Sequence, residues 1–307
     1  MKCSVLVATV RASTVGATIA SIRRQSYPEW ELLLLAQGHD AALRSVCEAA
    51  RRDDSRVRLL NLDELGKSRA INAGFRAASG EIIAMTDDDC EAREDWLATL
   101  VECFQREPAV GLVGGALLPP ERRHGWLAAV PSNVPADMLY DPIAHGRKAP
   151  DGFRWIGGNF AMRRSVVEEV GPYDECLGPG STFPYADDTD YLLRLEAHGV
   201  KMRSTPHVVV HHTFGYRYGL RSCVRSSRNA AAGNGGLAGK LSLLGDPRGR
   251  DWLNLTRREC TLGWLSEPAL QRLPTRLVFL WNFSAAYRRV LYRFRLDPVC
   301  NLLRPAI

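Results

Sequence analysis

Short apolar runs alternate with amphipathic segments through the first half of the chain. The runs have the length of buried strands, and the predicted strands are residues 4–9, 31–35, 57–61 and 82–86. The segments between them have apolar side chains at helical spacing, and the predicted helices are residues 15–25, 40–53 and 68–78. This alternation with short links predicts an α/β fold with a mostly parallel sheet covered on both faces. Ligands of such sheets bind beyond the carboxyl ends of the strands.

The second half of the chain is less regular. Residues 110–118 and 206–212 predict two further strands, and an amphipathic helix is predicted near residues 276–294. Residues 131–150 hold four prolines and little periodicity, which predicts a long loop. No internal repeat is present, so the pattern indicates a catalytic-size α/β domain with a helical extension.

Three adjacent carboxylates, Asp87, Asp88 and Asp89, directly follow the strand predicted at residues 82–86. Like charges side by side repel one another, and burying one of them unpaired costs several kcal/mol. A divalent cation held by oxygen ligands, shared with a substrate phosphate, makes such a triplet favourable. A solvated acidic turn explains it as well, so the triplet alone leaves both interpretations open.

A second acidic cluster, Asp187, Asp188 and Asp190, opens a predicted helix. Carboxylates at a helix N-terminus are stabilised by the free backbone N–H groups and by the helix dipole, so capping is a strong interpretation. One carboxylate is enough for a cap, however. A surplus carboxylate there can serve as a general base for an incoming hydroxyl.

The strand predicted at residues 206–212 ends in two histidines, His211 and His212. Neighbouring strand residues point to opposite faces, so at most one of them easily faces a site at the strand end. Such a histidine is most often structural or exposed. Here an imidazole can also serve as a further metal ligand or phosphate contact.

Composition narrows the classes of function. The net charge is +6, and the excess lies in the C-terminal third, where residues 216–258 hold nine basic and two acidic residues. Such an excess favours phosphates or an anionic membrane surface, whereas no reading motif supports nucleic acid. Eight cysteines without a Cys-x-x-Cys pair, a strand beginning near Met1, and no long apolar run predict a cytoplasmic protein with reduced thiols. Any membrane contact is expected at the inner face.

Five segments in a fixed order resemble the family 2 glycosyltransferases of the GT-A fold. They are residues 9–11, residues 21–31, residues 66–74, the acidic triplet followed by residues 95–97, and residues 187–188. No segment is decisive alone, and the order is what makes the resemblance specific. It extends over roughly residues 3–240 and implies a Rossmann-like GT-A sheet flanked by helices, with a C-terminal helical extension.

The resemblance implies inverting transfer of a sugar from a nucleotide-diphosphate sugar to an acceptor hydroxyl. Its Asp-x-Asp signature falls on Asp87 and Asp89, with Asp89 as the principal ligand of Mg²⁺ or Mn²⁺. Asp87 or Asp88 is implied to contact the ribose or sugar of the donor. We expect Asp87 and His212 as further metal ligands, and Asp188 matches the catalytic base of the family.

Further positions match the nucleotide pocket of the family: Thr9, Arg11, Arg69 and Asn72. Gln37 ends the second strand, where many relatives carry an aspartate that contacts the nucleotide. A uridine donor therefore cannot be assumed, and deoxythymidine and guanosine diphosphates stay open. The Gly-rich residues 225–240 resemble a mobile loop that closes over the diphosphate, with Lys240 supplying positive charge.

The expected organisation is a catalytic domain at residues 1–215 and a mobile Gly-rich loop with a helical region at residues 216–307. Within the catalytic domain we expect a donor half at residues 1–115 and an acceptor half at residues 116–215. The acceptor is a carbohydrate, a lipid-linked molecule or a natural product. The helix near residues 276–294 packs on the catalytic domain, on a second subunit of a homodimer, or on an anionic membrane surface.

Two other functions remain as alternatives. A sugar-1-phosphate nucleotidyltransferase also presents carboxylates and metal on an α/β sheet, but normally has a Gly-rich loop after the first strand. This chain has residues 8–13, Ala-Thr-Val-Arg-Ala-Ser, at that place. A non-catalytic nucleotide-sugar-binding module is the other alternative, and Asp188 together with the acidic triplet argues against it.

Overall fold

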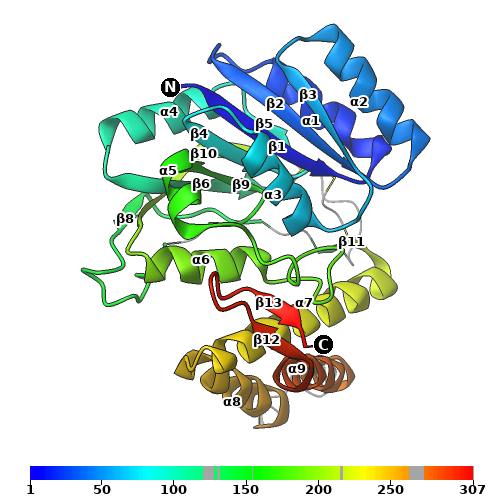
Figure 1. Ribbon diagram of the computed structural model, residues 1–307, viewed down its shortest axis with the longest axis vertical. Helices are drawn as coiled ribbons and strands as arrows, with labels where there is room; N and C mark the ends of the chain where they lie inside the picture. Colours follow the sequence, from blue (N-terminus) through cyan, green and yellow to red (C-terminus); the bar gives the residue numbers. More distant parts are fainter. Residues whose placement is uncertain (120–127, 130–131, 154, 215–216, 263–272, 307) are drawn as a thin grey trace. The chain divides into compact units, whose positions relative to one another are not determined.

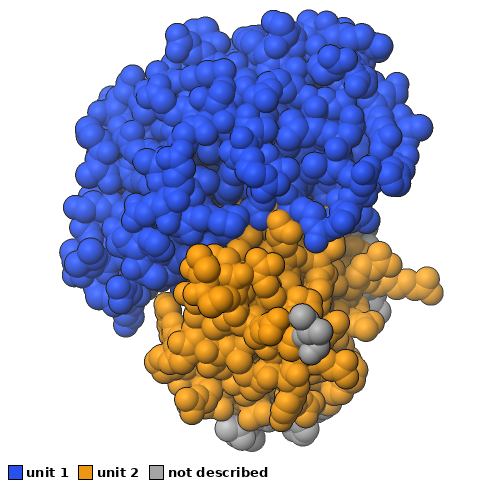
Figure 2. All heavy atoms as spheres, in the orientation of Figure 1, with its two compact units in different colours: residues 1–65, 69–172, 191–217 blue, residues 66–68, 173–190, 218–307 orange. Residues whose placement is uncertain are grey.

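The computed structural model describes residues 1–119, 128–129, 132–153, 155–214, 217–262 and 273–306. The chain forms two compact units, which are coloured separately in Figure 2. Unit 1 holds residues 1–65, 69–172 and 191–217, and unit 2 holds residues 66–68, 173–190 and 218–307.

Unit 1 contains a nine-stranded mixed sheet in the order β3-β2-β1-β4-β9-β6-β10-β5, with β8 also paired to β10 (Figure 1). Its strands are β1 Cys3–Thr9, β2 Trp30–Gln37, β3 Val57–Leu62, β4 Ile82–Thr86, β5 Glu91–Ala92, β6 Val110–Leu118, β8 Met138–Tyr140, β9 Asn159–Arg163 and β10 Lys201–His211. Strands β1 to β4 pair in parallel, and β6 pairs in parallel with β10. Strand β9 lies between β4 and β6 and is antiparallel to both. The predicted mostly parallel sheet is confirmed, with β9 as an inserted strand that the sequence pattern did not reveal.

Helices cover both faces of this sheet (Figure 1). The helices of unit 1 are α1 Ala12–Arg23, α2 Ala41–Asp53, α3 Lys67–Ala77, α4 Trp96–Arg106 and α5 Arg164–Val170, together with most of α6 Asp187–Ala197. Apolar residues of α1, α2 and α4 form one buried cluster with alternate residues of the strands, such as Val5 and Leu34. On the other face, Gly74 of α3 lies against Leu6 and Leu35. Because both faces are covered, the central strands β2 and β4 are buried at every position rather than at alternate ones.

A buried asparagine joins the strands near the middle of the sheet. The side-chain N–H₂ group of Asn159 donates to the carbonyl oxygens of Ala116 (2.7 Å) and Val208 (2.9 Å). Its side-chain oxygen accepts from the indole N–H of Trp96 at 2.8 Å. Asn159 thereby connects β9, β6, β10 and α4, which satisfies its polar atoms in the core.

Unit 2 is mainly helical. It contains α7 Gly219–Leu243, α8 Pro247–Leu262 and α9 Leu273–Arg293, and an antiparallel pair formed by β12 Phe294–Leu296 and β13 Leu303–Pro305. Two more short strands, β7 Ala128–Ala129 and β11 Arg217–Tyr218, complete the described elements. Within the described residues, no helix is long and apolar enough to span a bilayer.

The Gly-rich segment is helical, so the expectation of a loop at residues 225–240 is wrong. Two of its glycines face the neighbouring helix α9 Leu273–Arg293: a Cβ on Gly235 would lie 2.2 Å from the carbonyl oxygen of Phe283, and one on Gly239 would lie 2.7 Å from Cβ of Val290. The glycines thus permit close packing of α7 on α9. Glycine has a low helix propensity, but the tertiary packing of α7 outweighs it, so the segment is helical.

The predicted elements of the first half lie within a few residues of the observed ones. The strand predicted at residues 110–118 coincides with β6 Val110–Leu118. The unit boundary differs from the expected division at residue 215, because residues 173–190 group with the C-terminal helices. The loop predicted at residues 131–150 contains the short strand β8 Met138–Tyr140, and its residue 131 lies outside the described residues.

Candidate active site

The carboxyl ends of β1 and β4 bring Thr9, Arg11 and Asp88 together in unit 1. The two strands are parallel neighbours, so their ends lie at the same edge of the sheet. The hydroxyl of Thr9 donates to Asp88 at 2.8 Å, and the guanidinium of Arg11 forms an ion pair with the same carboxylate. The backbone N–H of Val10 also donates to Asp88, at 3.4 Å. Asp88 is buried, and its charge is met by Arg11 and these donors.

Asp89 lies between two positively polarised groups. Its Oδ2 is 3.0 Å from the guanidinium of Arg11, and its Oδ1 is 3.3 Å from Nε2 of His212. Burial by itself raises the pKa of Asp89, but the hydrogen bond and charge of His212, and the charge of Arg11, outweigh it and hold that pKa well below its ordinary value. Asp89 is therefore held ionised, as a metal-binding or cation-binding carboxylate needs to be.

Backbone pairing explains how two distant segments meet at Asp89. Strand β5 pairs antiparallel with the end of β10, where His211 lies opposite Glu91. The backbone N–H of Phe214 donates to the carbonyl oxygen of Asp89 at 3.1 Å. These bonds hold the residue after β10, His212, beside the acidic triplet. Of the two candidate histidines, His212 is the one that faces Asp89.

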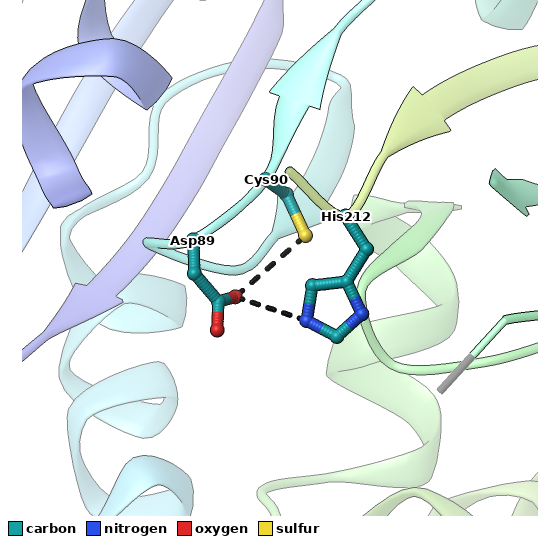
Figure 3. Close-up of side chains that lie close together, drawn as sticks. All are labelled: Asp89, Cys90 and His212. Atoms are coloured by element: carbon teal, nitrogen blue, oxygen red, sulfur yellow. Dashed lines mark hydrogen bonds and ion pairs between the residues drawn. The ribbon is translucent and has the colours of Figure 1, made fainter. Parts of the chain in front are cut away.

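The donor atoms around Asp89 fit a divalent cation. One carboxylate oxygen of Asp89, Nε2 of His212 and Sγ of Cys90 all lie within 4.8 Å of one another, and all three residues are buried (Figure 3). Two ligands that are each about 2.1 Å from one ion lie roughly 3.0–3.4 Å apart, close to the 3.3 Å between Asp89 and His212. Carboxylate ligands suit Mg²⁺ and Mn²⁺, and imidazole is a ligand of divalent transition-metal ions. The residues present therefore fit a bound divalent metal.

Cys90 belongs to this group, although the sequence analysis did not single it out. Its Sγ is 3.8 Å from Oδ1 of Asp89. The sequence signal was its position directly after the triplet. That signal is weak, because one cysteine carries no ligand pattern by itself.

Asp87 is not part of the group of described residues whose possible ligand atoms lie together, which is Asp89, Cys90 and His212. Its role as a metal ligand remains a prediction. Oδ2 of Asp87 instead lies against Gly158, where an added Cβ would be 3.1 Å away. The three neighbouring carboxylates are thus separated by their surroundings, Asp88 towards Arg11 and Asp89 towards both Arg11 and His212.

The remaining predicted donor-pocket residues of unit 1 are Gln37, Arg69 and Asn72. Gln37 is the last residue of β2 and is buried, as is Asn72 in α3. Arg69 of α3 forms an ion pair with Glu64. Their roles in nucleotide binding remain predictions.

Lys240 does not have the environment expected of a phosphate-binding lysine. In unit 2 its ammonium group is 2.9 Å from Asp174 and 2.6 Å from Asp190, and the Lys240 side chain is 1% exposed. Asp174 also accepts hydrogen bonds from the backbone N–H groups of Cys176 and Leu303. A buried ammonium needs such partners, because desolvation of an unpaired charge is costly. The expectation that Lys240 supplies charge to the diphosphate is corrected accordingly.

The second acidic cluster lies at the start of α6, in unit 2. Its three carboxylates have different surroundings: Asp187 and Asp190 are buried, and Asp188 is half-buried. Asp190 is the partner of Lys240. Asp188 is thus the most exposed of the three carboxylates, although its Oδ1 atom is buried. Asp89 and Asp188 belong to different units.

Comparison with known proteins places the chain in a family. The sequence profile of glycosyl transferase family 2 matches residues 4–171, more than half of the chain. The chain belongs to glycosyl transferase family 2. The match includes β1, the acidic triplet and β9, and it ends before the second acidic cluster.

Curated relatives are glycosyltransferases of several kinds. A glucosyl-dolichyl phosphate glucuronosyltransferase of Haloferax volcanii is 29% identical over 185 residues, which are 58% of this chain and 58% of the relative. A poly-beta-1,6-N-acetyl-D-glucosamine synthase of Staphylococcus epidermidis is 25% identical over 165 residues, 53% of this chain and 39% of the relative. The chain thus matches less than two thirds of the length of either relative.

Solved structures share the fold at low sequence identity. The mannosyltransferase PcManGT from Pyrobaculum calidifontis, in complex with GDP-Man and Mn²⁺, has a TM-score of 0.60 at 16% identity, covering 94% of this chain and 86% of that chain. TarS of S. aureus has a TM-score of 0.58 at 15% identity, covering 93% of this chain and 49% of that chain. The predicted GT-A fold with a C-terminal helical region is therefore confirmed.

Proposed function

We propose that this family 2 member is an inverting, metal-assisted glycosyltransferase that moves a sugar from a nucleotide-diphosphate sugar to an acceptor hydroxyl. The observation that carries the proposal is the cluster of Arg11, Asp89 and His212 at the carboxyl ends of the strands. It combines a fixed positive charge with a donor set suited to a divalent ion. A departing nucleoside diphosphate needs both.

Asp89 and His212 are proposed to hold the divalent ion, Mg²⁺ or Mn²⁺. A bound ion supplies neutralisation of the negative charge that develops on the leaving diphosphate. Arg11 adds a second positive charge at the same edge of the sheet, with Asp88 fixing its guanidinium. Thr9, Gln37 and Asn72 are proposed to line the nucleotide pocket.

Asp188 is proposed as the general base. The acceptor hydroxyl gives its proton to this carboxylate while its oxygen attacks the anomeric carbon, and the bond to the diphosphate oxygen breaks on the opposite side. Transfer by one in-line displacement inverts the anomeric configuration. The support is that Asp188 is a surplus carboxylate at the start of α6 and is half-buried, whereas Asp187 and Asp190 are buried.

The relatives suggest candidate donors and acceptors for the first assays. PcManGT was solved with GDP-Man and Mn²⁺. The name of the Haloferax volcanii relative records glucosyl-dolichyl phosphate, a lipid-linked sugar. We therefore propose guanosine, uridine and deoxythymidine diphosphate sugars as donors to test, and lipid-linked sugars as the first class of acceptor. The family membership gives no support to the nucleotidyltransferase alternative.

Thermal unfolding in the presence of each nucleoside diphosphate, with and without Mn²⁺, tests donor binding. A ligand at a hundredfold excess over its Kd stabilises the folded state by about 2.7 kcal/mol, so one base should raise the Tm clearly and only with metal. The control is the Asp53→Asn variant, which removes a carboxylate from an exposed position of α2 and should show the same metal-dependent Tm shift as the wild type. Absence of a metal-dependent shift for every diphosphate would contradict the proposed donor site.

The Asp188→Asn variant tests the base. Transfer should fall by about 10²–10⁴-fold, the usual contribution of a general base, while the nucleotide-induced Tm shift stays near that of the wild type. Transfer is measured as release of nucleoside diphosphate and as mass of the glycosylated acceptor. If binding persists in the wild type but no acceptor is glycosylated, the chain is a nucleotide-sugar-binding module.

A further inference from the structure

Helix α9 has two different apolar faces. One face carries Phe283, Tyr287 and Val290, which are buried within unit 2 and pack on α7. Packing on α7 within unit 2 accounts for these three residues, a partner that the three expected alternatives for this helix did not include. A membrane role would need a different face.

The other face of α9 is apolar and exposed. Leu277 is 44% exposed, Trp281 66% and Tyr292 81%. With Arg288, which is also exposed, these residues follow the spacing of one helical stripe, at intervals of four, seven and four positions. An exposed helix face that combines tryptophan, tyrosine, leucine and arginine is typical of helices that lie at a membrane interface.

Two adjoining hollows of about 620 and 850 Å³ lie along this region of unit 2 and share Val224, Arg228 and Asn282. Five arginines line them, three from α7, one from α8 and one from α9: Arg221, Arg225, Arg228, Arg257 and Arg288. Leu277, Val278 and Trp281 line the second hollow. No aspartate or glutamate lines either hollow among the residues that the structure describes. We call these residues the arginine groove.

Three arginines of α7 lie on the same exposed face of the helix. Arg221, Arg225 and Arg228 are spaced by four and three positions, so they share one face of the helix. All three residues are exposed to solvent. The two hollows are thus lined both by positively charged arginines and by exposed apolar side chains.

We propose that the arginine groove and the exposed face of α9 bind the surface of a bilayer that contains anionic phospholipids. Arginines would pair with lipid phosphates, while Trp281 and Leu277 would enter the boundary between headgroups and acyl chains. A second copy of the chain fits less well, because a symmetric contact would bring five arginines against the same five. Nucleic acid would match the arginines but leave Leu277 and Val278 without an apolar partner.

Sedimentation with vesicles of phosphatidylcholine, alone or mixed with phosphatidylglycerol, tests the proposal on the full chain. The wild type should bind the mixed vesicles and release from them as salt is added, because the charge attraction is screened. The double variant Arg225→Gln/Arg228→Gln should bind about 30-fold more weakly, at about fivefold for each arginine lost. The matched control is Arg51→Gln/Arg52→Gln in α2, which removes the same charge from exposed positions of unit 1.

Quenching by brominated lipids tests the apolar part of the surface. Tryptophan fluorescence of the wild type should be quenched on mixed vesicles, and Trp281→Phe should bind nearly as well but lose most of that quenching. Equal thermal unfolding of wild type and variants excludes loss of fold as the cause. The assay uses no sugar transfer, so its result is independent of the proposed enzymatic function.

Three outcomes would overturn the proposal. They are equal binding to neutral and mixed vesicles, equal loss of binding in the α2 control, and quenching that persists in Trp281→Phe. Salt-sensitive binding to a phosphatidylglycerol dispersion below its vesicle-forming concentration, but not to vesicles, would also overturn it, since the groove would then hold single lipid molecules.

Discussion

Two buried clusters in this chain each pair one cation with two carboxylates, yet their surroundings differ. In unit 1, Arg11 pairs with Asp88 and Asp89, and 43% of the Arg11 side chain remains exposed. In unit 2, Lys240 pairs with Asp174 and Asp190, and 1% of its side chain is exposed. Asp89 also faces His212, a potential metal ligand, whereas Asp174 is bonded to backbone N–H groups.

The difference teaches how the same charges can serve binding or stability. A cluster that solvent can reach can exchange water for a metal ion or a phosphate. A cluster sealed from solvent has no ligand to admit, and removing one of its charges leaves the others buried and unpaired. Variants of the first cluster should therefore lose function first, and variants of the second should lose stability first.

The largest effect is expected for Asp89→Asn. Sugar transfer should fall by about 10²–10³-fold, because a preorganised charge at the leaving group is lost. The amide oxygen can accept from Arg11 or from His212 but not from both, because the other position becomes an N–H₂ donor. Arg11 still pairs with Asp88, so the free energy of unfolding without ligand should fall by less than in Lys240→Met. Transfer rates and urea unfolding, each with and without Mn²⁺, measure the two effects. Wild-type transfer by Asp89→Asn would remove the functional side of the comparison.

Lys240→Met tests the sealed cluster. The free energy of unfolding should fall by about 3–5 kcal/mol, since two buried carboxylates lose their cation. Urea denaturation of the full chain measures this change. The triple variant Lys240→Met/Asp174→Asn/Asp190→Asn should recover part of the loss, because it buries no charge. If Lys240→Met unfolded with the same urea midpoint as the wild type, the cluster would not contribute to stability.

Glu31 extends the comparison to a buried carboxylate whose partner cation, Arg58, has a side chain that is 45% exposed. Burial raises its pKa, but hydrogen bonds from Ser4, Ser79 and Arg58 outweigh burial and lower the pKa from an ordinary 4.5 to about 2. Because the folded-state pKa is depressed, the stability from Glu31 is present above about pH 4.5 and is lost as the pH falls through about 2.

Glu31→Gln should therefore lower the free energy of unfolding by about 1–3 kcal/mol at pH 7, with the difference from wild type vanishing near pH 2. Urea unfolding across this pH range checks it. A difference between the two proteins that stays constant with pH would show that the charge of Glu31 contributes nothing.

The smallest effects are expected for two glycine substitutions that contrast the units. Gly235→Ala in α7 should destabilise by about 1–3 kcal/mol, because the new Cβ would lie 2.2 Å from the carbonyl oxygen of Phe283. Gly16→Ala in α1 meets nothing within 4 Å and should stabilise by roughly 0.5–1 kcal/mol. Thermal unfolding of both variants checks the signs. Destabilisation by Gly16→Ala would contradict the assignment of an open helix face.

Local pattern predicted the first half of the fold because each element there is a short, uniform repeat. Strand β6 and helix α2 were predicted to within one residue. The inserted strand β9 was missed, since the residues around it resemble a turn leading into helix α5. Its place between β4 and β6 depends on pairing with distant strands.

The chemistry of the site divides in the same way. The sequence indicates the acidic triplet and His212 as candidates, because three adjacent carboxylates repel one another and an imidazole at a strand end can bind a metal. Their pairing with Arg11, and the choice of His212 over His211, depend on the register of β5 against β10. Asp87 was given the same role as Asp89 because adjacent letters carry no orientation.

The amino-acid sequence by itself determined the α/β alternation, the family and the identity of the charged residues at the strand ends. Those features follow from apolar periodicity and from the order of short motifs, which need no knowledge of long-range contacts. The tertiary structure alone decided that the Gly-rich segment is a packed helix and that Lys240 is sealed between two carboxylates. Glycine permits a mobile loop in solvent but close helix packing in an interior. A lysine can bind a phosphate where solvent reaches it but must be paired where it is buried, and only packing fixes which environment each residue has.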